Sequence, residues 1–235
     1  MNHKIQQAYK ISASAFYPKI NFKTKEKSLL SYLLFRFQRP LLKLLTKWQL
    51  RKYKNAPWTS PASVAIFDQL LKSTMTGLEY GSGGSTVFFA EKLGKLVSIE
   101  HHEGWHTKVK NMLEEKNISN VDYLLIKPDF TKNSNTPFHE TYGLSDKDLR
   151  IKHRYSEYFD HVLNYEDQYF DFILIDGRAR VECLLNAIPK LKSGGLMVLD
   201  NSERSRYHIV FQVLKNWEMI HTTNGLTDTT IWFKP

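Results

Sequence analysis

The chain has 235 residues, of which 42% are hydrophobic and 24% are charged, proportions typical of a globular protein with one α/β domain and an appendage. Its single cysteine, Cys183, excludes an intrachain disulfide, so we expect a reducing, cytoplasmic location. The N-terminal segment 1–60 holds 13 Lys and Arg and one acid, a net charge of +12, whereas segment 61–235 holds 20 Lys and Arg and 23 Asp and Glu, a net charge of −3. This division argues against a basic catalytic face for nucleic acid.

The basic N-terminal part predicts an amphipathic helical extension over residues 1–56, followed by a domain over residues 57–235. Residues 27–54 are rich in Leu, Phe, Tyr and Trp, and cations recur among them at steps of three or four residues: Arg36, Arg39, Lys43, Lys47 and Arg51. On a helix these cations share one flank. We expect Pro40 to divide this helix or to begin a second one.

Two hypotheses describe residues 27–54. The helices either cover the substrate cleft or a dimer face with a basic outer surface, or they lie peripherally on an anionic membrane, at its inner face. Charges interrupt every apolar run of about 18 residues, so a membrane-spanning helix is not expected.

The stretch GLEYGSGGST, residues 77–86, places an acid and clustered glycines where an apolar strand leads into a helix. Gly81, Gly83 and Gly84 can adopt φ values closed to other residues and leave room for a ligand beside the main chain. The free N–H groups of the next helix would face that ligand. Glu100 ends the next apolar run after Glu79, LVSIE, where a carboxylate can accept hydrogen bonds from ribose hydroxyls.

Two later apolar runs, FDFILIDG at residues 170–177 and GGLMVLDN at residues 194–201, also read as strands that end in acids. Residues 179–192 between them read as a helix that ends at Gly194-Gly195. The order strand, helix, strand indicates an α/β fold. After it we expect another helix and two closing strands around the turn at Asn224-Gly225.

The motifs EYGSGGST, SIEH, ILIDGR and a Gly-Gly strand ending in Asp-Asn resemble, in this order, the class I S-adenosylmethionine-dependent methyltransferases, and among them groups that act on small molecules and sugars. The resemblance covers roughly residues 57–235. It implies a Rossmann-like doubly wound sheet of seven strands, five parallel plus a C-terminal antiparallel hairpin, with helices on both faces. One departure is that Ser85 occupies the last position of the acid-x-Gly-x-Gly-x-Gly pattern.

The resemblance also implies the donor site. Glu100 would hold the ribose and His101 would flank the adenine, while Asp129 would lie near the adenine amino group or, equally, serve as a turn acid after Pro128. The methionine part of S-adenosylmethionine would be surrounded by Glu79, Gly81, Ser82 and Gly83. A dinucleotide is the rival ligand, but a carboxylate at position 79 is unfavourable beside a pyrophosphate and suits a cationic methyl donor.

Similarity to the metal-dependent O-methyltransferases implies a magnesium site formed by Asp176, Asp200 and Asn201, all oxygen ligands. The alternative is that these side chains cap the following turns. Asp176 and His153 are the candidates for the catalytic base. Arginines follow both strands and would bind an anionic acceptor group or form surface ion pairs: Arg178, Arg180, Arg204 and Arg206.

We therefore expect a methyltransferase that acts on a hydroxyl of a small molecule, a sugar or a lipid-linked acceptor. The sequence IDGR stands where amino-methylating nucleic-acid enzymes carry their own motif, so no nucleic-acid partner is expected. The alternatives are a non-catalytic or membrane-recruited binding protein that keeps this fold and, resting only on the basic N-terminus, a nucleic-acid methyltransferase. A homodimer is compatible with each of them.

Overall fold

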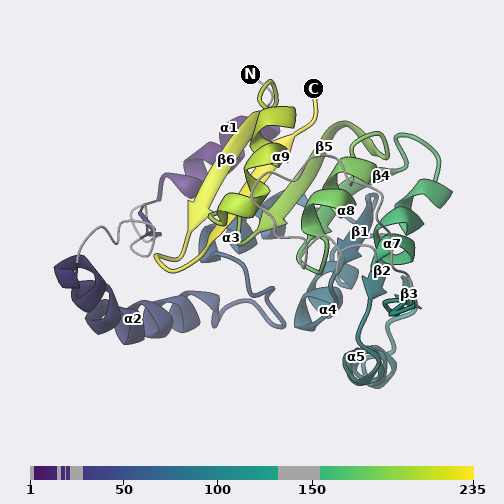
Figure 1. Ribbon diagram of the computed structural model, residues 1–235, viewed down its shortest axis with the longest axis horizontal. Helices are drawn as coiled ribbons and strands as arrows, with labels where there is room; N and C mark the ends of the chain where they lie inside the picture. Colours follow the sequence, from purple (N-terminus) through teal and green to yellow (C-terminus); the bar gives the residue numbers. More distant parts are fainter. Residues whose placement is uncertain (1–2, 15–16, 19, 22–28, 132–153) are drawn as a thin grey trace.

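The computed structural model describes residues 3–14, 17–18, 20–21, 29–131 and 154–235. In this part of the chain, seven strands form one sheet in the order β3-β2-β1-β4-β5-β7-β6 (Figure 1). The strands are β1 (Thr76–Tyr80), β2 (Lys95–Glu100), β3 (Val121–Leu125), β4 (Phe170–Ile175), β5 (Leu191–Asp200), β6 (Glu218–Thr223) and β7 (Asp228–Phe233). The first five run parallel, and β7 is antiparallel to both β5 and β6. The predicted sheet is confirmed.

Helices cover both faces of the sheet, as predicted. The helices are α1 (His3–Ser12), α2 (Leu29–Leu50), α3 (Pro61–Leu70), α4 (Gly84–Ala90), α5 (Glu103–Glu115), α7 (Ser156–Asp160), α8 (Arg180–Ala187) and α9 (His208–Val213). Short 3-10 helices lie at His161–Asn164 and Ser205–Tyr207. One hydrophobic cluster joins α1, α3 and α4 to the sheet, and a second joins α7, α8 and α9 to it. Neighbouring residues of β4 such as Phe172 and Ile173 belong to different clusters, which explains why the buried strands read as continuous apolar runs.

Two predicted boundaries are wrong. Helix α8 ends at Ala187 and β5 begins at Leu191, because Pro189 has no backbone N–H with which to continue the helical ladder. The glycine pair therefore lies inside β5, where Gly194 has a φ of +73°. Pro40 does not divide α2, which is one helix of 22 residues. The exposed position of Pro40 lets water hydrate the carbonyl group that the proline leaves without a donor.

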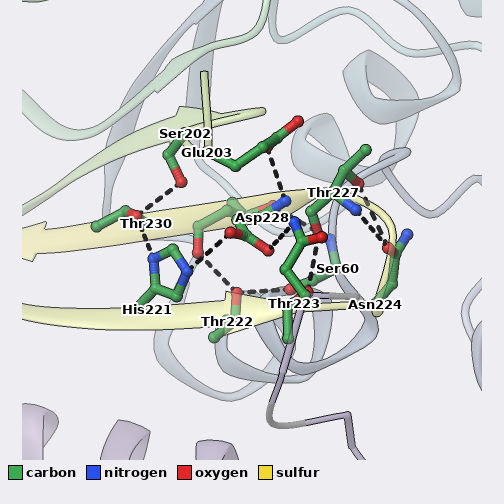
Figure 2. A network of polar contacts seen from close by, with 12 residues as sticks. Ser60, Ser202, Glu203, His221, Thr222, Thr223, Asn224, Thr227, Asp228 and Thr230 are labelled. Atoms are coloured by element: carbon green, nitrogen blue, oxygen red, sulfur yellow. Dashed lines mark hydrogen bonds and ion pairs between the residues drawn. The ribbon is translucent and has the colours of Figure 1, made fainter. Parts of the chain in front are cut away.

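A polar network fixes the C-terminal hairpin (Figure 2). Asp228 accepts a hydrogen bond from the side-chain amide of Asn21 at 2.8 Å and lies 3.0 Å from Nε2 of His221. Its backbone N–H donates to the Glu203 carboxylate at 3.0 Å. The other ring nitrogen of His221 lies 2.9 Å from the Thr230 hydroxyl. These contacts join the hairpin to residue 21 and to the segment after β5, so the edge of the sheet is held by side chains that are far apart in sequence.

Candidate active site

The loops after β1 and β4 meet where the strand order reverses, between β2 on one side and β5 on the other. The N–H of Gly81 donates to Ile99 O at 2.9 Å, and the N–H of Asp176 donates to Tyr80 O at 2.9 Å. Gly81 has a φ of +90°, and a Cβ atom there would lie 2.8 Å from the Cα of Gly177. Only glycine fits position 81. In open parallel sheets, ligands bind in the crevice formed at this kind of reversal.

Glu79 lies at the end of β1 and is fully buried. Its carboxyl group accepts hydrogen bonds from the hydroxyls of Ser85 at 2.5 Å, Thr86 at 2.6 Å and Ser98 at 2.8 Å. Burial raises the pKa of Glu79 to about 7, against the lowering effect of these three bonds. Glu79 therefore holds the first turn of α4 against β2, and its role toward the methyl donor stays a prediction.

Glu100, at the end of β2, lies directly beside the glycine loop. One oxygen accepts from the backbone N–H groups of His101 at 2.9 Å and His102 at 2.8 Å, and the other accepts from the backbone N–H and the hydroxyl of Ser82, at 3.1 and 3.0 Å. Burial favours the neutral form, but the hydrogen bonds from His101, His102 and Ser82 outweigh it and lower the pKa of Glu100 to about 2. Glu100 is thus a permanent hydrogen-bond acceptor at neutral pH.

Two side chains outside the sequence motifs, Trp105 and Tyr123, contact Ser82 of the glycine loop. The Ser82 hydroxyl lies 2.6 Å from the Tyr123 hydroxyl, and the indole N–H of Trp105 donates to Ser82 O at 2.6 Å. The His106 ring stacks on Tyr123 at a centroid distance of 4.3 Å. The sequence alone indicates only a packing or surface role for Trp105. No local signal could have revealed its contact with the loop, because α5, β3 and residue 82 meet only in the tertiary fold.

The remaining predicted donor residues make local contacts. Gly83 precedes α4, and its N–H donates to the Thr86 hydroxyl at 3.0 Å. The Nδ1 atom of His101 lies 3.0 Å from Glu100, and its ring meets that of Tyr155 edge-on at 5.6 Å. Asp129 is placed as a turn acid: its Oδ1 accepts from the N–H and the hydroxyl of Thr131, at 2.8 and 2.6 Å. Its assignment to the adenine is untested.

An arginine links the acids at the ends of β4 and β5. The Arg180 guanidinium donates to Gly177 O at 3.0 Å, to Asp176 O at 2.8 Å, to Asp176 Oδ1 at 2.7 Å and to Asp200 O, and it lies 3.6 Å from Asp200 Oδ2. Burial raises the pKa of both carboxyl groups, that of Asp200 to about 7. The second Asp200 oxygen accepts from Thr229 at 2.9 Å. The guanidinium is therefore the cation that these two acids share.

Solved structures share this architecture. A candidate caffeoyl-CoA O-methyltransferase from Staphylococcus aureus superposes with a TM-score of 0.51 at 15% sequence identity, over 88% of this chain and 100% of that chain. A methyltransferase-like protein from Silicibacter pomeroyi gives a TM-score of 0.48 at 26% identity, over 68% and 79% of the two chains. A candidate methyltransferase from Streptococcus mutans, in complex with SAH, gives 0.49 at 14% identity, over 71% and 93%. No protein-family model matches the chain, and no curated protein matches it significantly.

The strand order and the full-length match to the Staphylococcus structure decide the architecture. The chain has the class I methyltransferase fold. In this methyltransferase fold, the glycine loop and Glu100 lie at the carboxyl ends of β1 and β2, as the sequence predicted. The predicted catalytic residue His153 lies outside the described residues.

The predicted magnesium ligands do not fit a metal ion. Arg180 holds Asp176 and Asp200, while the side-chain oxygen of Asn201 accepts a hydrogen bond from Arg204 at 2.8 Å. A metal ion would have to displace the buried guanidinium from between the carboxylates. Over the described ranges, no group of three or more His, Cys, Asp or Glu residues could hold a metal ion. Arg180 therefore pairs with both predicted acidic ligands, and the structure gives no support to the magnesium prediction.

Proposed function

We propose that this protein is an S-adenosylmethionine-dependent methyltransferase that methylates a hydroxyl group of a small-molecule, sugar or lipid-linked acceptor. The observation that carries the proposal is the Glu100 carboxylate, held ionised beside the glycine loop of a methyltransferase fold. The ribose hydroxyls of a nucleoside can donate hydrogen bonds to this carboxylate, and the glycine loop next to Glu100 lets the ligand approach the main chain.

The residues around Glu100 fit a ribose. The Ser82 hydroxyl bridges Glu100 and Tyr123, so a ribose hydroxyl can take its place on the carboxylate while Ser82 keeps its bond to Tyr123. The backbone contacts from His101 and His102 would continue to orient the carboxylate. Binding would therefore cost one exchangeable hydrogen bond and leave no buried polar group unpaired.

Asp176 is the described residue best placed to receive the proton of the acceptor. Arg180 binds one oxygen of its carboxylate at 2.7 Å, and the side chain keeps 27% of its surface exposed at the carboxyl end of β4. Burial raises its pKa, which makes the carboxylate a stronger base. The sulfonium donor supplies the methyl group. The protein would align the acceptor oxygen, and the hydroxyl proton would pass to Asp176 as the carbon–oxygen bond forms and the carbon–sulfur bond of the donor breaks, with the neutral thioether as leaving group.

Calorimetry with S-adenosylmethionine tests the donor site. We expect the wild-type protein to bind, and we expect Glu100→Gln to bind about 10- to 100-fold more weakly, because hydrogen bonds to a charged group contribute about 1.5–3 kcal/mol. Glu103→Gln is the matched control, since Glu103 is an exposed acid on α5. Absence of wild-type binding, or equal weakening by both substitutions, would contradict the proposed donor site. Methylation of a hydroxyl acceptor and its loss in Asp176→Asn would then separate an enzyme from a binding protein.

A further inference from the structure

Helix α2 presents an apolar face to solvent. Six large side chains, here called the outward stripe, follow one another at alternating steps of four and three residues and are all exposed: Leu30, Leu34, Phe37, Leu41, Leu44 and Trp48. This spacing places them along one side of the helix. Phe37 is 87% exposed. The buried side chains of α2 are Leu42 and Gln49, which lie about a third of a turn from the stripe at 100° per residue, and Figure 1 shows the helix extending away from the sheet.

Cations occupy a separate side of α2. Arg36, Arg39, Lys43 and Lys47 are exposed and lie roughly 100° to 180° around the helix from the centre of the stripe, at 100° per residue. Arg51 and Lys52 follow directly after the helix. No Asp or Glu occurs anywhere in the helix. A helix with Leu, Phe and Trp on one face and Lys and Arg on a separate polar face has the composition of helices that lie in a membrane interface.

The charges favour one occupant over a second copy of the chain. Two copies joined through this face would bring their cationic helices together without a single acid on α2 to compensate them. An anionic bilayer instead satisfies both features, because it accepts the apolar side chains and attracts the cations. No helix among the described residues is long and apolar enough to cross a membrane. We propose that the outward stripe of α2 docks on the surface of a bilayer that contains anionic lipid.

The chain just after α2 contacts the glycine loop of the candidate active site. A cavity of about 490 Å³ lies beside the C-terminal end of α2. It is lined by Lys43 and Lys47 of α2, by Arg51 just after the helix, and by the aromatic residues Tyr53 and Trp58. A separate cavity of about 690 Å³ lies beside β3. Shortly after α2 ends, the backbone of Asn55 lies 3.5 Å from the position of a Cβ atom on Gly84, in the glycine loop. Docking would hold the donor loop near the lipid surface.

Flotation of the full chain with vesicles tests this proposal and requires no turnover, so its outcome is separate from that of the proposed function. We expect binding to vesicles of phosphatidylglycerol and phosphatidylcholine, and little binding to phosphatidylcholine alone. Phe37→Asp with Leu41→Asp should abolish binding. Asn111→Asp with Gln6→Glu is the matched control, because both residues are exposed and off α2, and it changes the net charge by the same amount.

A second variant keeps the stripe intact and tests the cations. Arg39→Gln, Lys43→Gln and Lys47→Gln together should weaken binding to anionic vesicles on the order of 100-fold, from about 1 kcal/mol for each cation near the surface. The control replaces three exposed lysines elsewhere with glutamine: Lys72, Lys110 and Lys116. Failure of the wild type to float would overturn the proposal, as would full binding by either α2 variant. A stable dimer that the stripe substitutions dissociate, without vesicle binding, would assign the face to a second copy instead.

Discussion

Replacing Arg180 by Met tests the link between β4 and β5. The methionine keeps much of the apolar stem but removes four hydrogen bonds and an ion pair, among them the contacts to two carboxylates that are largely buried. Breaking a buried ion pair by removing one partner costs about 3–5 kcal/mol, because the other charge is left uncompensated. We expect the free energy of unfolding to fall by about that amount at neutral pH.

Urea denaturation of the variant and the wild type, followed by tryptophan fluorescence, measures this loss from the midpoint and slope. Arg178→Met is the matched control, because Arg178 is exposed two residues away and exposed substitutions change stability by about 0.5 kcal/mol or less. Burial already raises the pKa of Asp200 to about 7, so at pH 5 this acid can hold a proton without the guanidinium. The deficit should therefore shrink at pH 5. A loss below about 1 kcal/mol, or one equal to that of the control, would refute this reasoning.

Three further results are expected. The folded-state pKa of Glu79 is raised from 4.5 to about 7. The free energy of unfolding should therefore fall by roughly 3 kcal/mol as the pH rises from below 4.5 to 7, because the folded state holds the proton more tightly than the unfolded state does. Glu79→Gln should remove this pH dependence from a series of urea titrations. Gly81→Ala should lower the Tm more than Gly194→Ala does, because both glycines have positive φ but only Gly81 meets a neighbouring backbone; equal shifts would contradict the packing argument. Magnesium or a chelator should leave the wild-type Tm unchanged, since Arg180 holds the acids, and a rise with magnesium alone would instead support the predicted magnesium site.

Most of the fold could be predicted from local sequence patterns. Four of the five parallel strands, β1, β2, β4 and β5, are short apolar runs that end at or just before an acid or glycine. The chain alternates such runs with helices, so the order of elements could be predicted before the sheet was known. The predicted boundary between α8 and β5 was wrong because single residues changed the local backbone. Pro189 ended α8 early, and Gly194 proved to be a bend within β5.

The site could be predicted only in part. Glu79, Gly81 and Glu100 lie at the ends of two consecutive strands of the chain, so their spacing indicated a shared site. Arg180 was predicted to bind an anionic acceptor group or to form surface ion pairs. Its actual partner Asp200 ends the next strand, and the two meet because β4 and β5 pair in the register Ile175 with Leu199. The same contacts argue against the magnesium prediction, because Arg180 pairs with the two acids that would have to bind the ion.

By itself, the sequence determined the alternation of strands and helices, the glycine loop and the concentration of positive charge near the N-terminus, because these depend on neighbours along the chain. Only the tertiary structure decided which groups neutralise the buried acids and which apolar side of α2 stays exposed. Those outcomes depend on strand register and on the packing of helices against the sheet. Both are set by contacts between residues that no local pattern connects.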